Sequence, residues 1–121
     1  MARILVVDDE PFIVKMVSSR LKANGYEVVS AYDGASALAA VNEKKPDLLL
    51  IDIMMPPPDG LSVCKTLRAD DGEVNAVPII LLTAKSSESE IAEAMKCGAD
   101  DYIVKPYNAE DLLSKIRKYV S

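Results

Sequence analysis

The sequence predicts an α/β fold in which a parallel sheet of five strands lies between two layers of helices. Five short apolar runs alternate with five helical patterns, which is typical of parallel strands joined by right-handed crossovers. The chain has 121 residues, of which 50% are hydrophobic and 27% are charged. This length suits one domain, and this composition excludes a disordered, collagen-like or low-complexity chain. We therefore expect a single domain over residues 1–121.

The predicted strands are short runs rich in Val, Ile and Leu, bounded by Asp, Pro and Gly. Three of them do not alternate between apolar and polar residues, which is typical of strands buried on both faces of a parallel sheet. The second run partly alternates and therefore suits a strand nearer the sheet edge. In chain order the runs are Ile4–Val7, Glu27–Tyr32, Leu48–Ile53, Ile79–Leu82 and Tyr102–Val104.

Helical patterns follow each of these strands, and residues that favour helix boundaries flank them. These residues are Pro11, Ser87 and Asn108 at helix starts, and Gly25 and Gly98 at helix ends. The predicted helices span Pro11–Asn24, Ala35–Glu43, Leu61–Arg68, Ser87–Lys96 and Ala109–Val120. In the first helix the apolar spacing predicts one buried face, formed by Phe12, Ile13, Met16, Val17 and Leu21.

Charge and cysteine content limit the classes of partner. The net charge is −5, so most of the surface would repel a phosphate backbone and we expect no direct contact with nucleic acid. No apolar run has the ~18 residues of a membrane span, and no signal-peptide pattern is present, so we expect no membrane contact. Cys64 and Cys97 have no metal-ligand spacing and indicate small apolar residues in the cytoplasm.

The sequence contains no histidine, so any chemistry depends on carboxylates, hydroxyls, lysine and metal. Ligands of such sheets bind outside the carboxyl ends of the strands, where the strand order reverses. The polar residues at these ends are Asp8, Asp9 and Glu10 after the first strand, Asp52 in the third, Thr83 after the fourth and Lys105 after the fifth.

Each of these residues alone has a simple structural explanation, because acids favour helix starts, Thr favours strands and Lys is commonly solvated. Asp52 is the exception, since apolar residues enclose it and an unpaired buried carboxylate costs several kcal/mol. If the first and third strands are neighbours, Asp8, Asp9 and Asp52 converge, and a proton or a cation must relieve their repulsion. An all-oxygen cluster favours a hard divalent ion, and we expect Mg²⁺. Lys105 and Thr83 would face this cluster and suit phosphoryl oxygens.

The chain contains, in this order, an acid pair, a central Asp, a Thr and a Lys-Pro. With this signature it resembles the receiver domain of two-component response regulators, over essentially the whole chain. The residues that carry the resemblance are Asp8-Asp9, Asp52 with the turn from Met55 to Gly60, Thr83-Ala84 and Lys105-Pro106. The resemblance implies a flavodoxin-like (βα)5 three-layer sandwich with strand order 2-1-3-4-5.

The resemblance also implies the roles of the acidic residues. Asp52 would be the phosphoacceptor. Asp9 and Asp52 would bind Mg²⁺ directly together with the backbone carbonyl of Met54, whereas Asp8 would act largely through water.

For the remaining residues, the resemblance implies that Thr83 and Lys105 hold the phosphoryl oxygens. Ala84 is small enough to leave the site open, and Tyr102 matches the family's aromatic switch position. The Lys105–Pro106 bond is expected to be cis, as is usual in the family. Pro58 is a departure, because the family often has Met there, and we expect the three consecutive prolines to stiffen this loop in an extended form.

Without a histidine in the chain, a donor imidazole must belong to another protein, and the resemblance implies which partners these are. The phosphoryl donor would be a sensor histidine kinase or a phosphotransfer protein, with small acyl phosphates as substitutes. The output would go to a downstream protein target or an effector domain, through the face built by the fourth helix, fifth strand and fifth helix. The expected residues of this face are Ile91, Met95, Tyr102 and Tyr107. The chain would catalyse its own phosphorylation and dephosphorylation without turning over an external substrate.

Other functions remain open on the sequence alone. A flavodoxin-type FMN electron carrier shares the fold, although the acidic segment after the first strand would repel the FMN phosphate. An aspartyl-phosphate phosphohydrolase would also use a carboxylate nucleophile, although the usual Asp-x-Asp after the first strand is absent. The third alternative is an interaction module that acts without phosphate.

Overall fold

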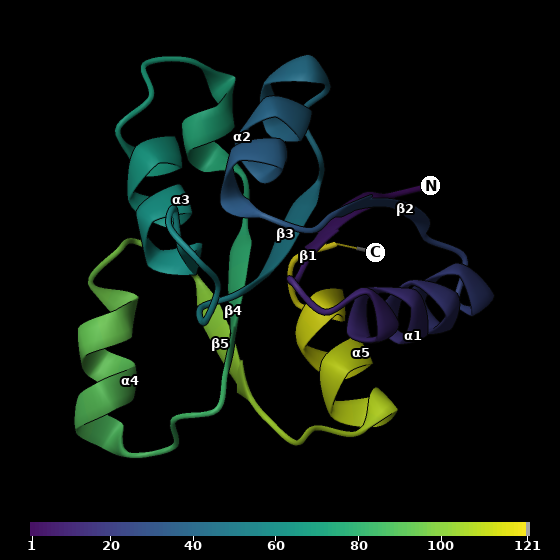
Figure 1. Ribbon diagram of the computed structural model, residues 1–121. Coiled ribbons are helices and arrows are strands. Elements are labelled where there is room, and N and C mark those ends of the chain that lie inside the picture. Colours follow the sequence, from purple (N-terminus) through teal and green to yellow (C-terminus); the bar gives the residue numbers. More distant parts are fainter. Residues whose placement is uncertain (121) are drawn as a thin grey trace.

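The computed structural model describes residues 1–120 and consists of a five-stranded parallel sheet between two layers of helices (Figure 1). The strand order is β2-β1-β3-β4-β5, so the predicted flavodoxin-like three-layer sandwich is confirmed. The order reverses between β1 and β3, and the crevice that ligands use in such sheets therefore lies at their carboxyl ends. The strands are β1 (Arg3–Val7), β2 (Glu27–Ala31), β3 (Leu48–Asp52), β4 (Ile79–Thr83) and β5 (Asp101–Val104).

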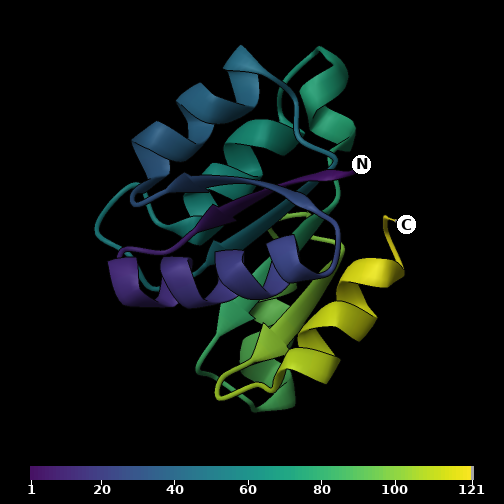
Figure 2. The same cartoon turned by 90° about the vertical axis from the view of Figure 1, so that its right-hand side faces the viewer.

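Helices cover both faces of this sheet, and α1 and α5 lie together on one face, opposite α2, α3 and α4 (Figures 1 and 2). The observed helices differ from the predicted ones by up to three residues at their ends. They are α1 (Pro11–Ala23), α2 (Gly34–Glu43), α3 (Gly60–Arg68), α4 (Glu88–Met95) and α5 (Ala109–Arg117), with a short 3-10 helix, η1 (Glu73–Ala76), that the sequence did not predict. Among residues 1–120, no helix has both the length and the apolar composition needed to cross a bilayer.

The two faces of the sheet form two separate hydrophobic cores, which explains the unbroken apolar runs. Along β1, Leu5 and Val7 pack toward α2 and α3, whereas Ile4 and Val6 pack toward α1 and α5. All residues of β3 and β4 are buried. In β2 only Ala31 is buried, which confirms its predicted place at the edge.

The buried face of α1 differs from the predicted one. Phe12 and Met16 are 71% and 51% exposed, so their predicted burial is wrong. The face that packs on the sheet is instead formed by Val14, Val17, Ser18 and Leu21. The apolar residues of α1 cover more of its circumference than the sheet can bury, which leaves an apolar strip in solvent.

The helix ends follow the predicted capping. The side chains of Ser87 and Asn108 accept the backbone N–H groups of Glu90 and Asp111, at 3.3 and 2.8 Å. Gly25 adopts a φ of +89° just after α1, a conformation that glycine reaches without steric cost.

The Pro56–Pro58 loop bends rather than running straight. The Pro57–Pro58 bond is cis, as is the Lys105–Pro106 bond. Residues 55–58 form consecutive bends, so the expectation of an extended segment is wrong.

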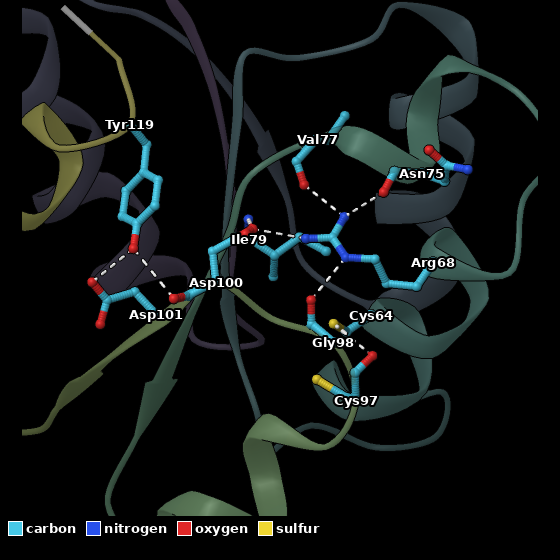
Figure 3. A network of polar contacts seen from close by, with 10 residues as sticks. All are labelled: Cys64, Arg68, Asn75, Val77, Ile79, Cys97, Gly98, Asp100, Asp101 and Tyr119. Carbon is cyan, nitrogen blue, oxygen red and sulfur yellow. Dashed lines mark hydrogen bonds and ion pairs between the residues drawn. The ribbon is translucent and has the colours of Figure 1, made fainter.

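Arg68, the last residue of α3, links several chain segments at the end of the sheet opposite the carboxyl ends (Figure 3). Arg68 donates hydrogen bonds of 2.7 to 2.8 Å to the carbonyls of Asn75, Val77 and Gly98 and to the carboxylate of Asp100. Nearby, Cys64 and Cys97 are both buried free thiols, and the Cys64 thiol contacts the Cys97 carbonyl at 3.4 Å. Burial of both side chains fits their interpretation as small apolar residues.

Candidate functional site

The carboxyl ends of β1, β3 and β4 carry three buried polar side chains. Asp8 is 0% exposed, and Asp52 and Thr83 are each 4% exposed, within an otherwise apolar sheet. Burial of such groups is unfavourable unless each finds a polar partner. The partners of these three side chains therefore show how the site is built.

Each of these side chains accepts the backbone N–H group two residues further along its own loop. Asp8 Oδ1 accepts from Glu10 at 3.0 Å, and Asp52 Oδ1 accepts from Met54 at 3.1 Å. Thr83 Oγ1 accepts from Lys85 at 3.0 Å. These turns fix one oxygen of each carboxylate, and they leave the second oxygen and the Thr83 hydroxyl proton free for other contacts.

Lys105 supplies the positive charge of the site. Its Nζ lies 3.0 Å from Asp52 Oδ2 and 3.4 Å from Asp8 Oδ2. Partial burial lowers the pKa of Lys105, but hydrogen bonds and charge from Asp52 and Asp8 outweigh burial and raise the pKa above its ordinary value. Lys105 therefore stays an ammonium that links the two carboxylates.

Asp9 completes an acidic cluster with these two carboxylates. Asp8, Asp9 and Asp52 each offer an oxygen, and the three oxygens lie within 4.8 Å of one another. Lys105 offsets only one of the three negative charges. This all-oxygen donor set with excess negative charge fits a hard divalent cation such as Mg²⁺.

The loop after β3 returns to the site at Gly60. The Gly60 N–H donates to the Ile53 carbonyl at 3.2 Å, and a Cβ at Gly60 would overlap the carbonyl oxygen of Asp52. Only glycine therefore allows α3 to begin this close to Asp52. The sequence contained a signal for this contact, because Asp59-Gly60 stands where the helix begins.

The remaining predicted residues surround this cluster. Ala84, the residue after Thr83, is exposed. Met54 follows Asp52 by two residues, and its side chain is also exposed. Tyr102 is half-buried on β5, where Val104, two residues further along, pairs with Thr83. Pro106 follows Lys105 through the cis bond described above. The geometry is thus compatible with the predicted arrangement, and the roles of these residues are taken up as proposals below.

The comparisons with known proteins agree with this geometry. Residues 4–117 match the family model described as the response regulator receiver domain. The chemotaxis protein CheY4 of Vibrio cholerae superimposes with a TM-score of 0.93 at 36% identity, covering 99% of both chains. The BeF3-activated receiver domain of Klebsiella pneumoniae RstA gives a TM-score of 0.86 at 32% identity, covering 97% of both chains.

A longer relative is similar over nearly all of this chain. The DNA-binding response regulator MtrA of Mycolicibacterium smegmatis is 43% identical over 115 residues, which are 95% of this chain and 49% of that protein. The chain thus spans about half the length of this curated relative. Together with the family model, the similarity shows that the chain belongs to the receiver domains of two-component response regulators.

Proposed function

We propose that Asp52 is the phosphoacceptor of this receiver domain. The observation that carries the proposal is the 3.0 Å contact between Lys105 Nζ and Asp52 Oδ2 inside the acidic cluster. A carboxylate oxygen held beside an ammonium group suits attack on phosphorus, because the ammonium stabilises the charge of the transferred group. Because the chain belongs to the receiver family, we prefer the function of a phosphoacceptor over that of an electron carrier or a phosphohydrolase.

In the proposed step, an oxygen of Asp52 attacks the phosphorus atom of the donor. A bond forms between this oxygen and phosphorus, and the bond from phosphorus to the donor breaks, so the donor leaves with the electron pair. Thr83 can donate its hydroxyl proton to a phosphoryl oxygen, because its Oγ1 already accepts from Lys85. Lys105 would hold a second phosphoryl oxygen.

Asp8, Asp9, Asp52 and the backbone carbonyl of Met54 are the groups that would hold Mg²⁺. When bound, the ion neutralises the charge of the carboxylates and of the incoming phosphoryl group. The excess negative charge of the cluster supports this assignment. Before phosphorylation, Lys105 pairs with Asp52 and Asp8.

The donor would be a phosphohistidine of a sensor kinase or phosphotransfer protein, and α1 suits its docking. Phe12 and Met16 are exposed beside the basic residues Lys15 and Arg20. These four residues line one shallow groove, and Met16 also lines a hollow with Lys105, Pro106 and Tyr107. An apolar surface with a basic rim that adjoins the site fits a partner surface with apolar and acidic side chains.

The output surface would be the face of α4, β5 and α5, including Ile91, Met95, Tyr102 and Tyr107, which are all partly buried. This surface would act on a downstream protein or on an effector domain. The net charge of −5 supports an output that involves no nucleic-acid contact by this domain, although MtrA is a DNA-binding regulator. The domain would work in the cytoplasm and would not turn over an external substrate.

Intact-protein mass spectrometry after incubation with an acyl phosphate and Mg²⁺ tests the proposal. The wild-type protein should gain one phosphoryl group, and Asp52→Asn should gain none. Asp59→Asn is a matched control, since it removes one nearby charge and keeps a side chain that can cap α3. Equal uptake by Asp52→Asn and the wild type would overturn the assignment.

A further inference from the structure

Lys115 of α5 reaches across the outer edge of the sheet to Tyr102. β5 is an edge strand, so its outward backbone groups have no neighbouring strand to pair with. The Nζ of Lys115 lies 2.9 Å from the carbonyl oxygen of Tyr102 and 4.6 Å from the centroid of its ring. One ammonium group therefore pairs the free carbonyl and contacts the aromatic ring of the same residue.

Asp101 fixes the position of this ammonium group. Its Oδ1 lies 2.7 Å from Lys115 Nζ. Its Oδ2 accepts the hydroxyl of Tyr119 at 3.0 Å (Figure 3). The backbone N–H of Tyr102 also donates to Oδ1, at 2.9 Å. The carboxylate thus holds Lys115 and the backbone of Tyr102 in one arrangement.

The direction of these contacts matters for Tyr102. Lys115 contacts Tyr102 from the outer edge of β5, whereas Thr83 lies on β4, the strand on the inner side of β5. A movement of the Tyr102 ring toward Thr83 would carry the ring away from the ammonium group. The contact between Lys115 and Tyr102 therefore opposes such a movement.

We propose that Lys115 is a positioning residue that holds Tyr102 in the unphosphorylated arrangement and so weakens the response to a phosphoryl group on Asp52. This inference rests on the proposed function of Asp52 and Thr83, and on the resemblance that makes Tyr102 the aromatic switch residue, whose ring would move toward Thr83 when Asp52 carries a phosphoryl group. By linkage, a contact that favours the unphosphorylated arrangement lowers the affinity of the site for a phosphoryl mimic. Removal of the contact must raise that affinity.

The variant Lys115→Met removes the ammonium group and keeps the length of the side chain. We expect it to bind beryllofluoride in the presence of Mg²⁺ about three- to tenfold more tightly than the wild type, the range for a partly exposed cation–π contact with an ion pair. The affinity can be measured by ¹⁹F NMR of bound beryllofluoride. Lys115→Arg keeps the charge and should restore an affinity near the wild-type value.

Lys118→Met is the matched control, since it removes an exposed lysine just after α5; it should leave the affinity unchanged. If Lys115 only stabilises the fold, Lys115→Met will lower the free energy of unfolding and leave the beryllofluoride affinity unchanged, which would overturn the inference alone. Failure of the wild-type protein to bind beryllofluoride would overturn the proposed function and the inference together.

Discussion

Replacement of Asp9 by Asn should stabilise the metal-free protein and greatly reduce its stabilisation by Mg²⁺. Asp9 is exposed and lies within 4.8 Å of the oxygens of Asp8 and Asp52, while Lys105 pairs with these two carboxylates. Asp9→Asn therefore removes repulsion and leaves both of those ion pairs in place. The two effects of the variant have opposite signs, which separates them from a general loss of structure.

The expected size follows from the separation of the charges. At 4.8 Å, the upper limit of the separations between oxygens in the cluster, two unit charges repel by about 0.9 kcal/mol in water and by about 3.5 kcal/mol at an effective dielectric constant of ~20. Because Asp9 is exposed, solvent screening favours the lower value for each of its two pairs. We expect the free energy of unfolding to rise by about 1 to 2 kcal/mol.

Urea denaturation with EDTA and with Mg²⁺ measures both effects. At a Mg²⁺ concentration about ten times its dissociation constant, the wild type should gain about 1.4 kcal/mol, and Asp9→Asn should gain much less. Asp71→Asn is the control, since it removes one exposed charge from a loop outside the cluster. The reasoning is refuted if Asp9→Asn destabilises the protein in EDTA or keeps the full gain with Mg²⁺.

Three further variants test the surrounding structure. Gly60→Ala places a Cβ against the carbonyl of Asp52, so urea denaturation should show a loss of about 2 kcal/mol or more, and Mg²⁺ binding should weaken; an unchanged stability would contradict the close contact. Arg68→Met removes four hydrogen bonds and should cost about 2 to 4 kcal/mol; a loss below 1 kcal/mol would contradict the role of Arg68. Burial raises the pKa of Asp101, but hydrogen bonds from Lys115 and its other partners outweigh burial and lower it, so this carboxylate stabilises the fold above its unfolded pKa of about 3.9. Asp101→Asn should therefore be destabilising at pH 7, with a difference from the wild type that disappears as the pH falls below about 4; a difference independent of pH would contradict this.

The pattern of apolar runs was sufficient to predict a parallel α/β sheet and the polar residues at its carboxyl ends. In a parallel sheet all carboxyl ends lie at one edge, so a polar residue that closes a buried apolar run lies near the others that do so. Asp8, Asp52 and Thr83 each follow or end such a run, and the structure places all three there. Strong apolar runs define the ends of the strands well, whereas the neighbouring positions of β1 and β3 were implied by the resemblance to the receiver family.

Residues outside this pattern could not be placed from the sequence. Phe12 and Met16 were assigned to the buried face of α1 because apolar spacing cannot show how much of a helix the sheet covers. The partners of Arg68 lie 7 to 32 residues away along the chain, and Lys115 meets Tyr102 only because β5 is an edge strand. Contacts of this kind depend on tertiary structure and leave no local signal.

The most direct test of the account is to locate the phosphorylated residue. Borohydride reduces an aspartyl phosphate to homoserine, so peptide mass spectrometry of the protein after phosphorylation by an acyl phosphate and reduction can identify the position. The account predicts homoserine at position 52 in the wild-type protein and at no position in Asp52→Asn. Homoserine at position 8 or 9, or none in a wild-type protein that had gained a phosphoryl group, would contradict it.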